Sequence, residues 1–412
     1  MIKLTYPQMV SGFRFGYAIV PYQPEFREYN NNSVAVEKRE ILNRICRYLS
    51  ENVKPPICIP FSGGVDSTIM LLAAMQCYHP KNIKCLTVYF DDFPQYDESE
   101  TARKICDKLG IYHQAFGVDI EVFNDVLDKV DSNNYHRWFY SSSLVPTYYA
   151  IRESFRIGSI VTGDGGDELY CGYDRYVGFA KMDNFPKWAW KLIRPPKSES
   201  PRRLRKFREA QKFGYRGLVS LWGEKEAEEL FDVDWLPEFD QVAPAIMDYP
   251  LEIRGNSLEK LMWYDIQTEL FGLEAEKVAT ARRMVQYFND GQPVNLYSPF
   301  MAKKDLPLYF ATRPEYKYRH GQKKWILREI IRDFLPDYDL ISPMNKRGFA
   351  APVSQWARNQ PLSRFMIRDG LLNDKKIKEI YKKNIFWEDY GECLWGLAVW
   401  KELLKKGMVE VE

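Results

Sequence analysis

Short apolar segments alternate with helical ones between residues 57 and 162, and this alternation restricts the possible folds more than any other feature. Periodicity predicts strands at 57–61, 83–90, 111–116 and 159–162. Helices are predicted between them, at 68–77, 98–109, 120–130 and 145–155. Because the strands are short and apolar, helices should cover both faces of the sheet. The pattern therefore predicts an α/β fold, a parallel twisted sheet between two layers of helices.

The pattern changes near residue 184, where four prolines between 186 and 201 mark a linker. Helical periodicity dominates beyond it, with helices predicted at 258–270, 323–334 and 393–404. Another amphipathic helix, at 34–53, precedes the first strand. We therefore expect three parts: a short N-terminal segment over 1–33, an α/β domain over 34–183, and a mainly helical C-terminal region over 184–412.

Charge and cysteine usage exclude several classes of protein. Lys and Arg total 58 against 56 Asp and Glu, so no overall charge favours nucleic acid or a membrane surface. The first twenty residues lack the apolar core of a signal peptide, and no apolar run approaches the ~20 residues that span a bilayer. The seven cysteines are scattered and form no C-x-x-C pair, which favours a reducing, cytoplasmic location.

The strongest chemical signal is the S-G-G-V-D-S segment at residues 62–67, between a predicted strand and a predicted helix. Backbone N–H groups and the helix dipole at such a junction can hold phosphate. Gly63 and Gly64 let the backbone approach a ligand closely. Asp66 suits a phosphate site only if a cation lies between them, and Mg²⁺ prefers such oxygen ligands. No G-x-x-x-x-G-K-[ST] segment is present, which excludes a Walker-type site.

A second signal, T-G-D-G-G-D-E-L-Y-C-G-Y at residues 162–173, follows the last predicted strand. It should open on the same edge of the sheet, where ligands of α/β proteins collect. Its three carboxylates, Asp164, Asp167 and Glu168, lie among glycines and suit metal binding or proton transfer. A solvated acidic turn is the alternative.

A third signal is formed by K-W-I-L-R at residues 324–328 and K-R-G-F at residues 346–349. Taken alone, these segments indicate a cationic amphipathic helix and a turn. For Lys324 by itself, an ordinary solvated or ion-paired lysine remains open.

Together the three signals resemble the synthetase domain of the asparagine synthetase family, within the N-type ATP pyrophosphatase superfamily. Residues 62–67 are similar to its pyrophosphate loop, and residues 162–173 to its motif S/T-G-[E/D]-G-x-D-E-L-F-x-G-Y. The third signal resembles the K-x-I-L-R and K-x-G-F segments. The matches run from about residue 34 to 356. The resemblance implies an adenine nucleotide alpha hydrolase-like fold and cleavage of ATP between its α and β phosphates.

The resemblance also implies roles for individual residues. Mg²⁺ would be held by Asp66 and Asp167. Asp164 would deprotonate or position the attacking amine, while Lys346 and Lys324 would stabilise charge at the phosphates. ATP would contact Phe61, Ser62, Gly63, Gly64, Asp66, Ser67, Val88, Thr162 and Gly163.

Two departures from the family pattern bear on the substrates. Residue 2 is Ile2, where the family has the cysteine nucleophile of a glutaminase domain. The nitrogen is therefore expected from ammonia, from a separate glutaminase or from an amine on the substrate. Before Pro299, residues 295–298 read N-L-Y-S in place of E-x-R-x, so an acceptor-side arginine is missing. Aspartate is accordingly a doubtful substrate, and relatives that use an internal amine offer another precedent.

The sequence thus predicts an ATP-dependent ligase that adenylates a small-molecule or peptide carboxylate, releases pyrophosphate, and transfers the acyl group to ammonia or an amine. Two alternative functions would require other sequence features. A tRNA- or nucleobase-modifying or sulfur-inserting pyrophosphatase would require a cysteine pair, a zinc cluster or a basic RNA-binding face, and none is evident in the sequence. A non-catalytic nucleotide-binding protein would be expected to lose charged residues such as Asp66, Asp167 and Lys346. Nucleic acid and membrane partners are not expected.

Overall fold

The computed structural model describes residues 2–4, 36–129, 141–177, 221–231, 262, 265–266, 275–302, 304–342, 351–367, 372–387 and 390–411. At its centre is a five-stranded sheet in the order β4-β3-β2-β5-β6. Every neighbouring pair of these strands is parallel. The strands are β2 (Ile57–Pro60), β3 (Ile83–Phe90), β4 (Tyr112–Val118), β5 (Ser159–Val161) and β6 (Leu296–Tyr297).

The strand order reverses direction at β2. The chain adds β3 and β4 on one side of β2, and then β5 and β6 on the other. Because β2 and β5 are parallel neighbours, the loops that follow them leave from adjacent positions on one edge of the sheet. Ligands of open α/β sheets bind in the crevice at such a reversal. The fold therefore brings residues 62–67 and 162–167 together.

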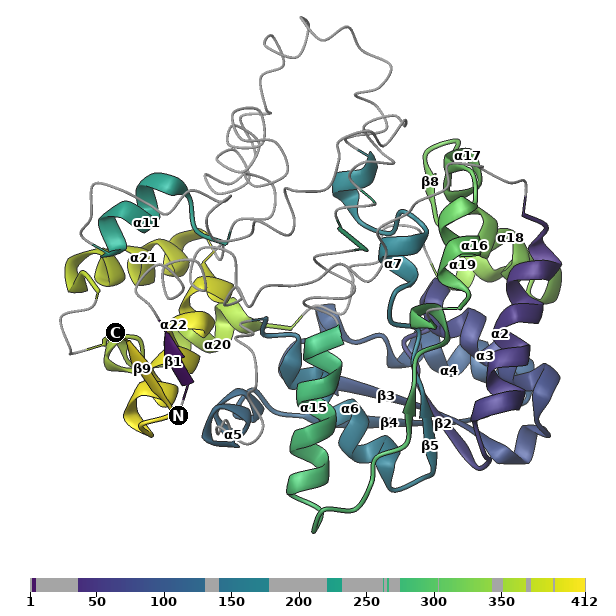
Figure 1. The fold of residues 1–412 in the computed structure, drawn as a ribbon, viewed down its shortest axis with the longest axis horizontal. Coiled ribbons are helices and arrows are strands. Elements are labelled where there is room, and N and C mark those ends of the chain that lie inside the picture. Colours follow the sequence, from purple (N-terminus) through teal and green to yellow (C-terminus); the bar gives the residue numbers. More distant parts are fainter. Residues whose placement is uncertain are drawn as a thin grey trace, which may run out of the picture.

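Helices cover both faces of the sheet (Figure 1). One face packs against α2 (Lys38–Asn52), α3 (Val65–Cys77), α4 (Ser99–Leu109) and α18 (Trp325–Phe334). The other face packs against α5 (Val122–Lys129), α6 (Leu144–Phe155) and α15 (Ala275–Tyr287). We call the two hydrophobic clusters the α3-side core and the α6-side core. The predicted fold class is confirmed.

Strand β5 shows how the two cores are separated. Ile160 belongs to the α6-side core and the next residue, Val161, to the α3-side core. Side chains alternate between the faces of a strand, so consecutive apolar residues fill opposite cores. This explains why the strand was recognisable as a continuous apolar run.

The remaining described elements are mostly helical. The α3-side core continues into α16 (Leu306–Ala311), α17 (Pro314–Lys317) and α19 (Tyr338–Ile341), and a short α7 (Gly166–Leu169) follows β5. The α6-side core extends into α11 (Glu224–Phe231), α20 (Val353–Asn359), α21 (Asp374–Trp387) and α22 (Gly391–Lys405). Short 3-10 turns are η1 (Pro80–Asn82), η2 (Pro94–Tyr96), η5 (Pro299–Met301) and η6 (Leu362–Arg364).

Two small sheets complete the described structure. Strands β1 (Ile2–Leu4) and β9 (Val409–Val411) pair in parallel, so the two ends of the chain lie together beside α22 (Figure 1). Strands β7 (Tyr318–Arg319) and β8 (Gln322–Lys323) form an antiparallel pair just before α18.

Several predicted boundaries need correction. The helix expected at 68–77 begins three residues earlier, so its first turn includes Asp66. The helix expected at 323–334 begins at Trp325, because Lys323 belongs to β8 and Lys324 has a left-handed backbone. The helix expected at 34–53 spans Lys38–Asn52. Strand β6 was not predicted, and two residues are too few to show periodicity. Most of the helix predicted at 258–270 lies outside the described residues.

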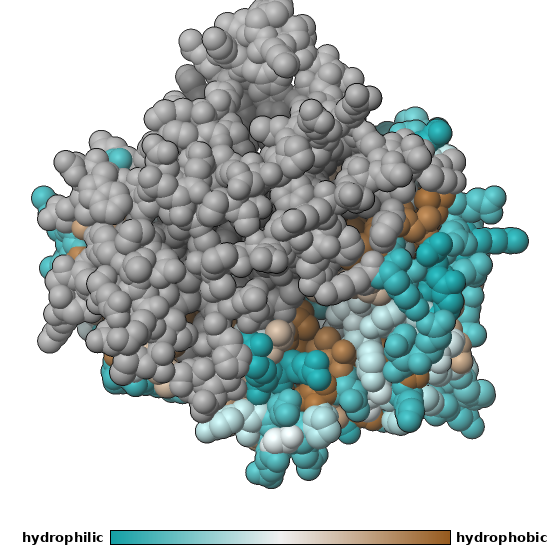
Figure 2. Space-filling view, viewed as in Figure 1, coloured by the Kyte–Doolittle hydropathy of each residue, from teal (hydrophilic) through white to brown (hydrophobic). Residues whose placement is uncertain are grey.

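Hydrophilic side chains cover much of the visible described surface, with smaller hydrophobic areas among them (Figure 2). Amphipathic helices such as α2 and α4 contribute this polarity, since their apolar residues face the core. In the described part of the chain, no helix has the length and apolar character that crossing a membrane requires.

Candidate functional site

The loop after β2 turns directly into α3. Gly63 has a φ of +69°, and a Cβ there would lie 3.0 Å from Thr101 Cγ2, so both conformation and space favour glycine. The Gly64 N–H donates to Ser62 Oγ at 3.3 Å, and the Ser67 hydroxyl donates to the Gly64 carbonyl at 3.2 Å. The first N–H groups of a helix have no partner within it, so this end of α3 is suited to an anion.

A buried lysine joins the three sequence signals. The Lys324 ammonium contacts the carboxylate of Asp66 in α3 and lies 2.6 Å from Asp167 Oδ1 in α7. Burial lowers the pKa of Lys324, but the carboxylates of Asp167 and Asp66 outweigh it and hold the pKa above its ordinary value. Lys324 is therefore a fixed positive charge at the carboxyl edge of the sheet. Of the two ordinary roles left open for Lys324, the solvated one is excluded by its burial, and the ion-paired one is observed.

Glycines make room for this ionic cluster. A Cβ on Gly163 would lie 2.8 Å from Asp66 Cβ, and a Cβ on Gly166 would lie 2.1 Å from Asp66 Oδ1. A Cβ on Gly172 would lie 1.6 Å from Asp167 Oδ1 and 2.4 Å from the Cε of the lysine. The glycines at 163, 166 and 172 thus have a steric cause, because side chains there would displace the charged groups.

The backbone of Lys324 is itself unusual. Its φ is 55°, in the left-handed region, although it is not glycine. Such a conformation costs on the order of 1 kcal/mol or more and persists only where the surroundings enforce it. Here the Lys324 N–H donates to the Tyr170 carbonyl at 3.2 Å, between β8 and α18. The strained residue directs its side chain into the carboxylate pair.

A pair of hydroxyls lies at the neighbouring strand ends. Thr162 Oγ1 and Ser298 Oγ are 2.7 Å apart, and the Thr162 N–H donates to the Tyr297 carbonyl at 2.9 Å. Ser298 was not among the predicted site residues. The one sequence feature that could have indicated Ser298 is its position just before Pro299, in the altered acceptor segment. The unpredicted strand β6 brings it to the edge.

Four other predicted residues are Phe61, Val88, Asp164 and Lys346. Phe61 is buried, and its carbonyl accepts a hydrogen bond from the Thr87 hydroxyl. Val88 lies near the carboxyl end of β3 and is half-buried. Asp164 is half-buried in the same loop as Gly163, and among the described residues it forms no ion pair with the site lysine. Lys346 lies outside the described residues.

The third acidic residue of the second signal has a different environment. Glu168 is almost fully buried, and its Oε1 accepts a hydrogen bond from the Tyr173 hydroxyl. A buried carboxylate needs such donors to offset its lost hydration. Glu168 therefore anchors the loop, whereas Asp167 faces the ionic cluster.

The donor set is compatible with a divalent cation. In the described part of the chain, no three His, Cys, Asp or Glu side chains gather as ligands. Asp66 and Asp167 nevertheless already hold a cation, the ammonium of Lys324. Mg²⁺ is usually bound by one or two carboxylates together with phosphate oxygens and water. These two residues fit that pattern.

A parallel sheet with glycine-rich acidic loops at its strand reversal defines the class of α/β proteins that bind ligands at the carboxyl edge. Within that class, the family model described as asparagine synthase matches residues 52–402. The chain belongs to the asparagine synthase family.

Curated relatives are distant. The chain is 23% identical over 350 residues to "Amidase chry2" of Gibberella zeae, covering 73% of this chain and 50% of the relative. It is 25% identical over 213 residues to "Amidase chyE" of Penicillium rubens, covering 45% and 30%. A "Probable asparagine synthetase [glutamine-hydrolyzing]" of Acanthamoeba polyphaga mimivirus is 29% identical over 137 residues, covering 32% and 24%. The chain thus spans about half or less of these relatives.

Proposed function

We propose that the protein is an ATP-dependent, AMP- and pyrophosphate-forming amide ligase. A substrate carboxylate attacks the α-phosphorus of ATP, pyrophosphate leaves, and ammonia or an amine then displaces AMP from the acyl-adenylate. Family membership supports the reaction class. The buried ionic cluster of Asp66, Asp167 and Lys324 beside the loop at 62–67 is the observation that carries the proposal.

The cluster suits the charge that this reaction develops. Attack at the α-phosphorus builds negative charge on the phosphorus centre and on the departing pyrophosphate. A positive charge fixed in advance stabilises that change most, because it needs no reorganisation during the reaction. The raised pKa of Lys324 keeps it an ammonium. The first turn of α3 and the Ser62 and Ser67 hydroxyls would hold the phosphates.

The remaining roles follow from the resemblance to the asparagine synthase family. Phe61, Val88, Thr162 and Gly163 line the strand ends where adenosine would lie. Asp66 and Asp167 would hold Mg²⁺, which supplies further charge neutralisation at the phosphates when bound. Asp164, near the second loop's start, would position or deprotonate the amine, and Lys346 would stabilise the transition state. Holding the acyl-adenylate beside the amine contributes through proximity.

The test is incubation with ATP, Mg²⁺ and a panel of small-molecule and peptide carboxylates, with product analysis by chromatography. AMP and pyrophosphate are expected in equal amounts, and ADP as product would reject the mechanism. Asp66→Asn should abolish turnover, while Asp174→Asn provides a matched control. Asp174 is a neighbouring carboxylate that pairs with Lys323 at 2.7 Å, but its side chain is 95% exposed.

The nitrogen donor can be identified in the same assay. Turnover that requires added ammonium indicates ammonia as the acceptor, supplied in the cell as such or by a separate glutaminase. Turnover without ammonium indicates an amine carried by the substrate or by a second substrate. Release of AMP without any amide product would reject the ligase assignment.

A further inference from the structure

Tyr338 reaches the loop at 62–67 from a distant part of the sequence. It is the first residue of α19 and is fully buried in the α3-side core. Its hydroxyl donates a hydrogen bond to the Gly63 carbonyl at 3.1 Å. Burial raises the pKa of Tyr338, so the hydroxyl keeps its proton and remains a donor. None of the sequence signals includes this residue.

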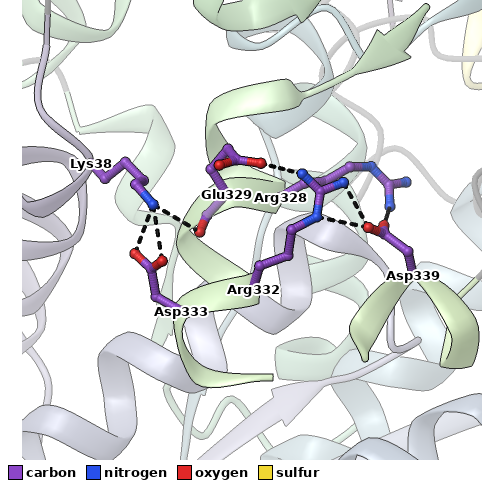
Figure 3. A network of polar contacts seen from close by, with 6 residues as sticks. All are labelled: Lys38, Arg328, Glu329, Arg332, Asp333 and Asp339. Carbon is purple, nitrogen blue, oxygen red and sulfur yellow. Dashed lines mark hydrogen bonds and ion pairs between the residues drawn. The ribbon is translucent and has the colours of Figure 1, made fainter. Parts of the chain in front are cut away.

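Both sequence neighbours of Tyr338 are held by ion pairs. Asp337 lies 2.7 Å from the Lys108 ammonium of α4. Asp339 accepts from Arg328 Nη1 and from Arg332 Nε, each at 2.8 Å, and these arginines belong to α18 (Figure 3). The start of α19 is therefore fixed to two helices, α4 and α18, of the α3-side core.

The ring of Tyr338 also makes a cation–π contact. The Arg328 guanidinium lies 5.8 Å from the ring centroid, and Arg328 is itself almost fully buried. A cation within about 6 Å of an aromatic face is attracted to it. The ring is thus restrained by packing, and its hydroxyl has a defined direction.

The hydrogen bond to Gly63 constrains the next amide. In a trans peptide unit, the C=O of one residue and the N–H of the next point in opposite directions. Fixing the Gly63 carbonyl toward Tyr338 therefore directs the Gly64 N–H away from it, toward Ser62 Oγ at 3.3 Å. Glycine backbones have many alternative orientations, so two consecutive glycines need an outside restraint.

We infer that Tyr338 is a positioning residue that orients the Gly63–Gly64 peptide and so holds the loop at 62–67 in the shape that receives the β and γ phosphates. The inference rests on the proposed function for the identity of the ligand. The orientation of the peptide itself does not depend on that function.

A matched control exists in the same core. Tyr309, in α16, is also fully buried in the α3-side core. Within the described structure its hydroxyl has no hydrogen-bond partner. Tyr309→Phe and Tyr338→Phe therefore remove the same atom from similar surroundings, and only the second breaks a bond to the loop.

The experiment compares wild type, Y338F and Y309F by two measurements. The first is calorimetric binding of ATP, pyrophosphate and AMP, each with Mg²⁺. The second is amide hydrogen exchange of the segment at 61–67 in the unliganded protein. Losing one neutral hydrogen bond should weaken ATP and pyrophosphate binding about three- to tenfold in Y338F, with AMP changed by less than about twofold. Loop exchange should accelerate about three- to tenfold, and Y309F should match wild type.

The outcomes separate the two proposals. Unchanged loop exchange in Y338F would overturn the inference. Equal weakening of AMP and ATP, or a melting temperature more than about 5 °C below that of Y309F, would indicate a general structural role and overturn it as well. If wild type binds neither ATP nor pyrophosphate, the proposed function fails, and the exchange measurement alone decides whether Tyr338 holds the loop.

Discussion

The two faces of the sheet differ in what they bury. On the α3 side, charged groups penetrate to the carboxyl edge, where Lys324 meets Asp66 and Asp167. On the α6 side, the core is rich in large aromatic rings. Among the described residues, the four fully buried tryptophans all belong to the α6-side core: Trp222, Trp356, Trp395 and Trp400.

This difference separates function from stability. Burying paired charges rarely adds net stability, because lost hydration offsets the attraction between them. Burying aromatic rings contributes substantially to folding. Substitutions at the α3-side ionic cluster should therefore impair chemistry, and substitutions in the α6-side core should impair stability.

The largest effect is expected for Lys324→Ala. Loss of the fixed ammonium should reduce turnover roughly 100- to 1000-fold, the range found when one preorganised electrostatic group is removed. The adjacent Lys323→Ala is the control, because Lys323 pairs with an exposed carboxylate outside the cluster. Rates of AMP and pyrophosphate release measure both variants. Comparable turnover in the two variants would show that Lys324 is not a functional residue. It would also contradict the assignment of function to the α3 side.

Trp356→Ala is expected to give the largest loss of stability. Trp356 is fully buried, stacks on Phe123 with ring centroids 5.5 Å apart, and meets Trp395 at 5.4 Å. Truncation should lower the free energy of unfolding by about 3–5 kcal/mol, because it removes buried area and leaves a cavity. Urea denaturation measures the loss.

The activity of the Trp356 variants then tests whether the α6-side core contributes to stability without contributing to turnover. At a temperature where Trp356→Ala remains folded, turnover should stay within about threefold of wild type, since the ring is part of the opposite core. Trp356→Phe should be milder on both counts. A collapse of turnover in folded protein would mean that the α6-side core also shapes the site.

The features predicted from the sequence were those encoded locally. The short apolar segments that alternate with helical ones located β2 to β5, and the boundaries of β3, Ile83–Phe90, are predicted without error. Glycine-rich segments at strand ends identified both loops, because a strand–glycine–helix junction can be recognised within about a dozen residues of sequence. The exception is the first turn of α3, which includes Asp66 and Ser67 although the helix is predicted only from residue 68. Asp and Ser also favour turns, so the sequence alone does not separate the two states.

Contacts between distant segments were not predictable in this way. Tyr338 and Gly63 are 275 positions apart, and Thr162 and Ser298 are 136 apart. Nothing in the local pattern of either residue signals its partner. The left-handed backbone of Lys324 was equally hidden, since a lysine seldom adopts that conformation. Resemblance to a family selected Lys324, whereas its bond to both carboxylates required the fold.

A smaller effect is expected for Glu392→Gln on the α6 side. The Glu392 carboxylate, in the first turn of α22, accepts hydrogen bonds from the Ser142 N–H at 2.9 Å and from the Ser142 hydroxyl, just before α6. Replacing a charged acceptor with an amide should lower the free energy of unfolding by about 1–2 kcal/mol. Thermal denaturation measures this, with turnover unchanged. Reduced turnover at unchanged stability would assign this contact to the functional site, and so show where the functional part of the α6 side begins.

The smallest effect is expected for a charge pair on the α3 side that lies outside the cluster. Lys38 in α2 and Asp333 in α18 are 2.9 Å apart, with side chains 40% and 56% exposed (Figure 3). Exposed pairs contribute little, so Lys38→Met should lower the free energy of unfolding by no more than about 0.5 kcal/mol. The difference should shrink further in high salt.

A double-mutant cycle with Asp333→Asn isolates this pair, because Lys38 also donates to the Glu329 carbonyl at 3.4 Å. Urea denaturation of wild type, both single variants and the double variant at low and high salt supplies the coupling energy. A coupling above about 1 kcal/mol that persists in high salt would contradict the expectation for exposed pairs. It would mean that ion pairs between α2 and α18 contribute directly to the stability of the α3 side. The functional role would then be confined to the cluster around Lys324 and would not extend to the whole face.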